Sequence, residues 1–263
     1  MDRSFLSDQR VVAASRNFVC IRLATYEDQQ EAEFMSRVFT PRSGVLENTT
    51  FGILAPDGKR NLVTPGRGPM HAFRDATDMA NKMRVIALQH PGAMQSAWAD
   101  QRLPVMNSVD VALNVAACDN LPLLVTFAEN EQRLAEINNA LLKTAWSESL
   151  AGQFVYGSTS NKQELKPILG VKGNSAKLAE GILVVEPGPY GLSGKILCEL
   201  PGTPISDQTA VELSKALASF SRRPPEYASH IQLGIQLGID WESAIPETDQ
   251  QSIRAKERAR GTR

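Results

Sequence analysis

Three cysteines, Cys20, Cys118 and Cys198, are the residues of this chain best suited to covalent chemistry. A cysteine becomes a nucleophile or a redox centre when its surroundings favour the thiolate, as a nearby cation or a helix amino terminus does. Cys20 and Cys198 lie within apolar segments, which predicts that they pack inside strands. Cys118 precedes an apolar segment in a partly polar stretch, so it is the candidate exposed thiol, although the neighbouring Asp119 opposes a thiolate.

The sequence contains no other recognisable catalytic or metal-binding motif. The three histidines, His71, His90 and His230, fall in separate segments without the spacing of zinc ligands. Neither the Gly-x-Ser-x-Gly pattern of hydrolases nor the phosphate-binding Gly-x-x-x-x-Gly-Lys-Ser/Thr pattern occurs. We therefore predict no metal and no cofactor, and the odd number of widely spaced cysteines argues against a disulfide framework.

The composition is that of a soluble globular protein. The chain has 263 residues, of which 42% are hydrophobic and 22% charged, enough for two domains of ordinary size. A net charge of -1 gives no reason to expect a nucleic acid or an anionic membrane as partner. Residues 1–7 lack the long apolar segment of a signal peptide. We expect a cytoplasmic protein, or a secreted or periplasmic one if the amino terminus has been trimmed.

A short fragment of the sequence occurs twice. Val12-Ala13-Ala14 and Val115-Ala116-Ala117 each precede an apolar run. The offset between the two copies is kept without gaps as far as the pair Glu33 and Glu136. This repeat predicts two copies of one domain.

Hydrophobic periodicity predicts that each copy reads strand, helix, two strands, helix. The elements of the first copy are a strand at 17–23, a helix at 29–39, strands at 49–55 and 60–63 joined by a Pro-Asp-Gly turn, and a helix at 71–88. Those of the second are a strand at 121–127, a helix through 134–145, strands at 181–185 and 195–200, and a helix at 208–220.

This order of elements resembles the thioredoxin-like fold, as do the Pro-Asp-Gly hairpin and the Asn120-Leu121-Pro122 entry into a central strand. The resemblance covers most of residues 10–90 and 112–220. It implies an α/β protein with two tandem thioredoxin-like domains, each a central mixed β-sheet flanked by helices. The predicted boundaries are 1–95 for domain 1, 96–111 for a connector, 112–222 for domain 2 and 223–263 for a C-terminal extension.

Active members of this family carry Cys-x-x-Cys at the start of the helix that follows the central strand. Here the two helix starts read Thr25-Tyr26-Glu27-Asp28 and Asn130-Glu131-Gln132-Arg133. Thr25 and Asp28 match a capping box, and Asn130 can cap the second helix. The acidic residues beside them complement the helix dipole and oppose a thiolate. Both copies therefore predict helix caps where a dithiol would stand.

The same positions are the candidate binding site. The family's cis-proline, which precedes its hairpin, is matched here by Thr49 or Thr50. A carboxylate-lined binding spot is the alternative to ordinary caps, and its residues would be Thr25, Tyr26, Glu27, Asp28, Thr49, Thr50, Asn130 and Glu131.

The C-terminal region carries an alternating apolar pattern. Period two predicts a strand or an extended docking segment, formed by Ile231, Leu233, Ile235, Leu237 and Ile239. This segment either packs on its own chain or adds as a strand to another subunit. Residues 252–263 are basic without interleaved aromatic residues, which predicts a solvated tail rather than a nucleic-acid-binding arm.

The sequence as a whole predicts a thioredoxin-like protein without dithiol chemistry that binds a protein or peptide partner. One alternative is a thiol-disulfide oxidoreductase or peroxidase that uses Cys118 alone. A second is a structural subunit of an oligomeric assembly, joined through the segment from Ile231 to Ile239. No nucleic-acid or membrane partner is expected.

Overall fold

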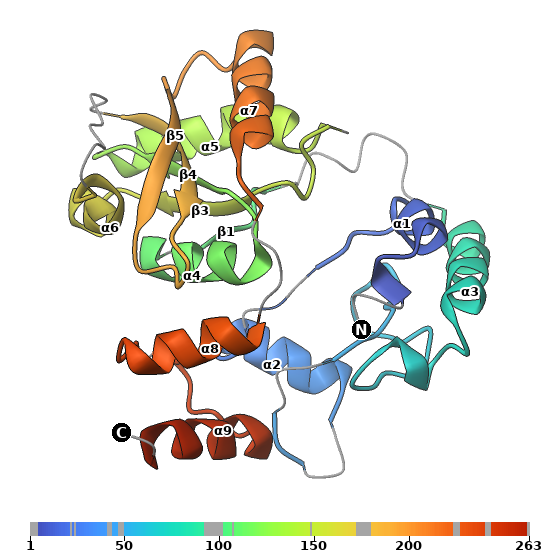
Figure 1. Ribbon diagram of the computed structural model, residues 1–263. Coiled ribbons are helices and arrows are strands. Elements are labelled where there is room, and N and C mark those ends of the chain that lie inside the picture. Colours follow the sequence, from blue (N-terminus) through green and yellow to red (C-terminus); the bar gives the residue numbers. More distant parts are fainter. Residues whose placement is uncertain are drawn as a thin grey trace. The chain divides into compact units, whose positions relative to one another are not determined.

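The computed structural model shows an α/β protein (Figure 1) whose chain divides into two units. Unit 1 comprises residues 1–97 and 241–263, and unit 2 comprises residues 98–240. The structure describes residues 5–21, 23, 25–40, 44–46, 50–91, 102–106, 108–147, 149–171, 180–222, 227–239 and 243–261.

Unit 2 contains a five-stranded mixed sheet with the strand order β1-β3-β2-β4-β5. The strands β1, β3 and β2 are parallel, β4 is antiparallel to β2, and β5 is antiparallel to β4. Val125 at the centre of β2 pairs with Gly157 on one side and Leu183 on the other. The bounds are β1 (Val105–Met106), β2 (Leu123–Phe127), β3 (Val155–Thr159), β4 (Gly181–Pro187) and β5 (Gly194–Leu200).

Helices cover both faces of this sheet (Figure 1). Leu124 packs in the layer under α5 and α7, and Val125 packs in the layer under α4 and α6. All five residues of β2 are buried, which explains its continuous apolar sequence. The helices of this unit are α4 (Val109–Asp119), α5 (Glu131–Ala145), the short η4 (Lys162–Leu165), α6 (Lys166–Leu169), α7 (Asp207–Ser219) and α8 (Tyr227–Gln236).

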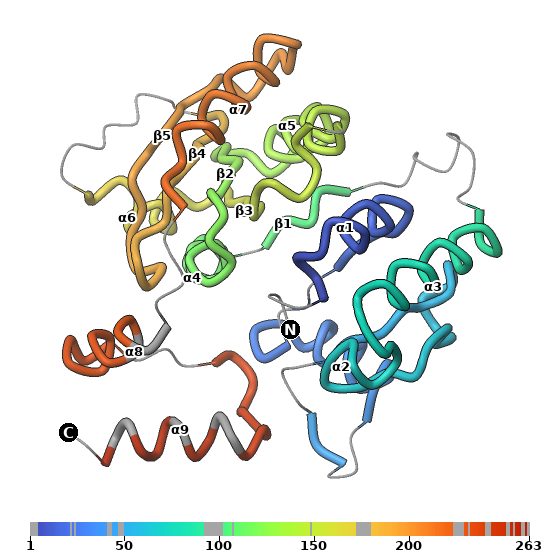
Figure 2. Tube along the Cα trace, turned by 45° about the vertical axis from the view of Figure 1, so that its right-hand side comes forward, coloured from blue at the N-terminus to red at the C-terminus, as the bar shows by residue number. Residues whose placement is uncertain are grey.

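Unit 1 is built from helices around a small apolar core. Figure 2 shows α1 and α3 running beside one another, and their contact buries Val11, Ala14 and Met79. A turn at Gly58, with φ of 66°, closes a narrow hairpin that makes isolated bridges between Phe51 and Gly66 and between Leu54 and Asn61. The helices are α1 (Gln9–Ser15), α2 (Gln29–Val38), η2 (Pro69–His71), α3 (Ala76–Gln89) and α9 (Gln250–Gly261).

The strand predicted at 17–23 is not formed in the described residues 17–21 and 23. Val19 and Ile21 are 85% and 62% exposed, and Cys20 is exposed rather than packed in a strand. The strands predicted at 49–55 and 60–63 are reduced to the two isolated bridges. A β-forming sequence becomes a strand only when a neighbour pairs with it, and none of the described residues pairs with residues 17–21 or 23.

The strand predicted between Ile231 and Ile239 is also wrong, because residues 227–236 form the helix α8. The N–H groups of Gly238 and Ile239 donate to the carbonyls of Ile235 and Gly234 after the last turn, and Gly238 has φ of 68°. This is the glycine-dependent end of an α-helix. The alternation of apolar residues with Gly and Gln therefore reflects composition rather than a strand.

The helical period of α8 brings two residues against one aromatic ring. The ring of Tyr190 stacks on that of His230 with centroids 4.2 Å apart, and its hydroxyl donates to the carbonyl of His230 at 2.9 Å. Gly234 lies one turn later, where an added Cβ would be 3.0 Å from the same ring. Glycine at 234 thus permits α8 to pack closely on the loop between β4 and β5.

The basic residues predicted as a solvated tail belong to the helix α9 through Gly261, where Arg254 and Arg258 are exposed. The N–H of Ile253 donates to the carbonyl of Asp249 at the start of this helix. Lys256 forms an ion pair of 2.7 Å with Glu247, a residue that precedes the helix. The ion pair ties the helix to the segment before it.

Tyr156, buried in β3 beside Phe154, makes the stability of unit 2 sensitive to alkaline pH. Burial raises its pKa to about 12. Tyrosine in the unfolded chain ionises near pH 10, so the contribution of Tyr156 is present below that pH and is lost as the pH rises towards 12. Tyr156→Phe is expected to remove about 1.4 kcal/mol of this alkaline loss at pH 11, which is one pH unit above the pKa of tyrosine in the unfolded chain.

Urea denaturation near pH 8 and near pH 11 measures the effect. Tyr190→Phe is the matched control, and it should keep the alkaline loss of the unaltered chain. Parallel stability profiles for the two variants would contradict the assignment of this loss to Tyr156.

Candidate functional site

The candidate site of unit 2 lies where α5 begins, just after the carboxyl end of β2. Oδ1 of Asn130 accepts a hydrogen bond of 3.1 Å from the N–H of Arg133, so Asn130 caps the helix as the sequence predicts. Glu131 in the first turn accepts a hydrogen bond of 2.8 Å from the hydroxyl of Ser160, which follows β3. The helix start therefore follows the end of β2 and is tied to the end of β3.

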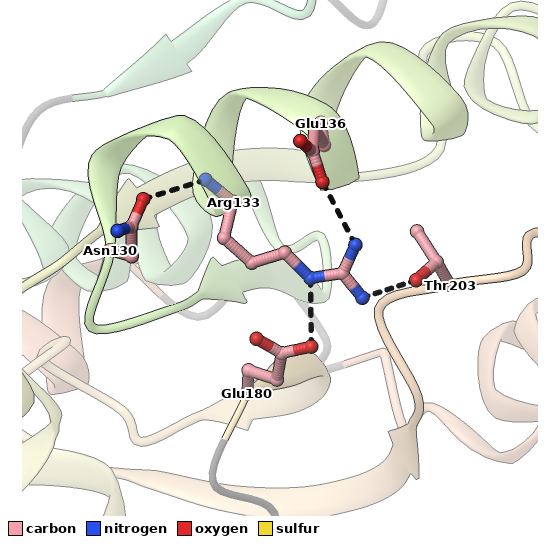
Figure 3. Close-up of polar contacts among 5 residues, drawn as sticks. All are labelled: Asn130, Arg133, Glu136, Glu180 and Thr203. Atoms are coloured by element: carbon pink, nitrogen blue, oxygen red, sulfur yellow. Dashed lines mark hydrogen bonds and ion pairs between the residues drawn. The ribbon is translucent and has the colours of Figure 1, made fainter.

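Arg133 is the centre of this site (Figure 3). Its Nε donates to Glu180 at 2.8 Å, its Nη1 donates to Glu136 at 3.0 Å, and its Nη2 donates to the hydroxyl of Thr203. Glu180 and then Glu136 raise the pKa of the guanidinium. About one third of the Arg133 side chain is exposed, so the cluster lies at the surface.

The partners of Arg133 come from separate parts of unit 2. Glu180 directly precedes β4, and Thr203 lies between β5 and α7. Gly202 brings the Thr203 segment close to α5, because an added Cβ there would lie 2.4 Å from Ile137. One arginine thus joins the start of α5 to both segments that flank the antiparallel strand pair.

A second polar group fixes α5 against the sheet behind this cluster. The hydroxyl of Thr126, which is fully buried, lies 2.6 Å from Oδ1 of Asn138. Nδ2 of Asn138 donates to the hydroxyl of Ser158 at 3.0 Å. These bonds satisfy polar groups that would be costly to bury alone, and they fix the position of α5 over β2 and β3.

The corresponding position in unit 1 corrects one sequence prediction. Asp28, not Thr25, is the N-cap of α2, and it accepts from the N–H groups of Gln30 at 2.8 Å and Glu31 at 3.0 Å. Thr25 is buried in the preceding turn. A carboxylate directly before the helix satisfies two first-turn donors, so no capping box is needed.

Tyr26 in this turn is bound by the segment that precedes α9. Its hydroxyl donates to the carbonyl of Leu46 at 3.1 Å and accepts from the N–H of Asp249 at 3.2 Å. Its own carbonyl accepts from the N–H of Ile245 at 2.8 Å. Three other residues predicted for this site take no part in the bonds just described. Glu27 is half-buried beside Tyr26, and Thr50 precedes the hairpin bridge at Phe51. Thr49 lies outside the described residues.

The cysteines do not meet at either helix start. Cys118 is exposed, as predicted, in the last turn of α4, which leads into the amino end of β2, whereas α5 leaves from the opposite end of that strand. Cys198 is half-buried in β5, and burial followed by the charge of Glu212 raises its pKa. Cys20 is exposed as a residue, although partial burial of its thiol raises its pKa.

Within the part of the chain that the structure describes, no group of three or more His, Cys, Asp or Glu side chains is arranged to hold a metal ion. None of the helices in those residues has the length and apolar character needed to cross a membrane. Comparisons of the chain with protein-family models, curated proteins and solved structures found no match.

The sequence analysis did not predict the central role of Arg133 or the contributions of Glu180 and Thr203. Arg133 lies in the first turn of α5, but no local signal links it to Glu180 and Thr203, which are 47 and 70 residues away. The one signal in the sequence was the charge of Arg133, a cation in the first turn of a helix that begins with the acidic Glu131.

The cap at Asn130 is expected to contribute to the stability of unit 2. Asn130→Ala should lower the free energy of unfolding by about 1 kcal/mol, because an N–H of the first turn loses its acceptor. Asn139→Ala is the matched control, since Asn139 is exposed inside the same helix, where alanine is favoured. Urea denaturation of both variants tests this, and equal loss in the two would contradict the capping role.

Proposed function

We propose that this chain is a thioredoxin-like protein that has no dithiol centre and acts by binding a protein or peptide partner. The order of elements in unit 2 supports the resemblance: β2 and α5 are followed by β3, the short helices η4 and α6, the antiparallel pair β4 and β5 and the final helix α7. In unit 1 the helices α1, α2 and α3 and the hairpin occur in the matching order. The tandem arrangement is part of the proposal.

The observation that carries the proposal is what stands at the start of α5. Redox-active relatives would carry Cys-x-x-Cys there, whereas this chain has Asn130 as a cap and Arg133 bound to Glu180, Glu136 and Thr203. A guanidinium bound by two carboxylates and a hydroxyl offers no redox chemistry, but it holds three chain segments in fixed positions. Fixed polar groups on a rigid element suit recognition of a peptide.

Hydrogen-bonding groups surround this cluster at the surface. Glu131 and Glu180 present carboxylate oxygens, and each uses one of them in the bonds described above. Asn130 uses its carbonyl oxygen in the cap, which turns its NH₂ group away from the helix. Donors and acceptors so placed match the N–H and C=O groups of an extended peptide.

Arg133→Gln is expected to weaken peptide binding about fivefold to tenfold, because Glu180 and Thr203 lose the group that positions them. Peptides would be selected from a random display library on the immobilised full chain, and their affinities measured by fluorescence polarisation. Lys215→Gln is the matched control, since it removes an exposed ion pair of 2.8 Å with Glu212 on α7. Failure to enrich any peptide, or equal binding by both variants, would sink the proposal.

The competing oxidoreductase function depends on the exposed thiol of Cys118. We expect a thiol reagent near pH 7 to label Cys118 no faster than a free cysteine, and to label Cys198 slowly until the chain is denatured, because burial raises the pKa of Cys198. Mass spectrometry of native and denatured samples gives both rates. Labelling of one cysteine much faster than free cysteine would favour the oxidoreductase instead.

The oligomeric alternative rests on a different surface now that residues 227–236 are known to be helical. Leu233 on α8 and Leu237 just after it are 48% and 62% exposed. Two exposed leucines are a small apolar surface, and single surface leucines are common in monomers. Peptide binding at the start of α5 is therefore the preferred function.

A further inference from the structure

The segment from Ser243 to Asp249 lies on the turn of unit 1 that corresponds to the helix start of the proposed binding site in unit 2. Three hydrogen bonds hold the segment there, and a fourth joins Tyr26 to Leu46 beneath it. The N–H of Ile245 donates to the carbonyl of Tyr26 at 2.8 Å, and the N–H of Asp249 donates to the Tyr26 hydroxyl at 3.2 Å. Both that hydroxyl and the hydroxyl of Thr248, at 2.6 Å, donate to the carbonyl of Leu46.

These bonds have the character of peptide recognition. Residues 246–249 have no regular secondary structure, and Pro246 favours an extended conformation at Ile245. Two of the segment's three bonds use its main-chain N–H groups, and the third uses the Thr248 hydroxyl. Main-chain pairing with one side-chain contact is how extended peptides bind to protein surfaces.

The segment also carries its own internal support. The carboxylate of Glu247 accepts from the hydroxyl of Ser243 at 3.0 Å and pairs with Lys256 of α9 at 2.7 Å. These contacts hold residues 243–249 in the bound conformation, which reduces the entropy lost on binding to Tyr26. Tyr26 is only 8% exposed under this cover.

We propose that residues 243–249 are a built-in ligand of the Tyr26 surface, and that a peptide partner binds unit 1 by replacing them. This inference rests on the proposed function in that the partner is a peptide. The partner is an extended segment with the chemistry of Ile-Pro-Glu-Thr-Asp: an N–H that meets the Tyr26 carbonyl, a hydroxyl that meets the Leu46 carbonyl, and a following N–H that meets the Tyr26 hydroxyl.

Competition between the attached segment and a free copy tests this inference. The probe is a fluorescein-labelled synthetic peptide of residues 243–261, added to the full chain. In the unaltered chain the attached segment competes at an effective concentration of the order of millimolar, so the probe should bind weakly. The double variant Ile245→Pro with Thr248→Val removes two of the bonds of the attached segment and leaves Tyr26 intact.

We expect this double variant to bind the probe about 10-fold more tightly than the unaltered chain, since each bond lost weakens the competitor roughly fivefold. Adding Tyr26→Phe should weaken the gained affinity about threefold, because the N–H of Asp249 in the probe loses its acceptor, and the same loss in the attached segment offsets part of the effect. Tyr190→Phe, added instead, removes a similar tyrosine-to-carbonyl bond in unit 2 and should leave the gain unchanged.

Hydrogen exchange of the unaltered chain provides a reading that needs no variant. Saturating unlabelled peptide should accelerate exchange at the amides of Ile245 and Asp249 in the attached segment. No gain of affinity in the double variant, or a gain that Tyr26→Phe and Tyr190→Phe affect equally, would overturn the inference.

The outcome also separates this inference from the proposed function. A gain that depends on Tyr26, in a chain for which no library peptide is enriched, supports the built-in ligand and contradicts partner binding. Enriched peptides that depend on Arg133, together with no gain in the double variant, do the reverse.

Discussion

The burial of β2 on both faces is the constraint on which unit 2 depends. Its side chains supply both apolar layers, so the helices on either face are positioned by one five-residue strand. Its carboxyl end also sets where α5 begins, and with it the position of Arg133. The polar contacts from Thr126 to Asn138 and Ser158 then fix the orientation of α5 on the sheet. The polar cluster at the surface therefore rests on the packing beneath it.

Unit 1 shows what happens when the repeated sequence lacks that constraint. The segment from Asn17 to Leu23, which the sequence repeat aligns with the start of β2, has β-forming residues but no paired strand among those described, and Val19 and Ile21 stay exposed. The helices on either side, α1 and α2, form nonetheless, since a helix satisfies its own backbone groups. In place of an adjacent strand, the C-terminal segment contacts this region: the N–H groups of Ile245 and Asp249 donate to Tyr26.

Features with a local physical cause were predictable from the sequence. The cap at Asn130, the turn at Gly58 and the apolar strand β2 each depend on a few adjacent residues. Long-range contacts were not, because neither the partners of Arg133 nor the pairing of Tyr26 with Asp249, 223 residues later, leaves a periodic signal. The alternation of apolar residues before Gly238 wrongly predicted a strand for a related reason. A helix can contain this pattern when one of its faces packs on an aromatic ring, as α8 does on Tyr190.

The contact between Tyr26 and Asp249 bears on the order in which the protein folds during synthesis. Unit 2 lies entirely between the two parts of unit 1, so all of its residues leave the ribosome before Asp249 does. Its sheet and helices can pack while Tyr26 still lacks its contacts with Ile245 and Asp249, because domains fold as units from the amino terminus onward. The last step is then the closure of a loop spanning 223 residues, whose entropic cost grows only slowly with length. Translation through residue 249 thus sets the earliest moment at which unit 1 reaches its final form.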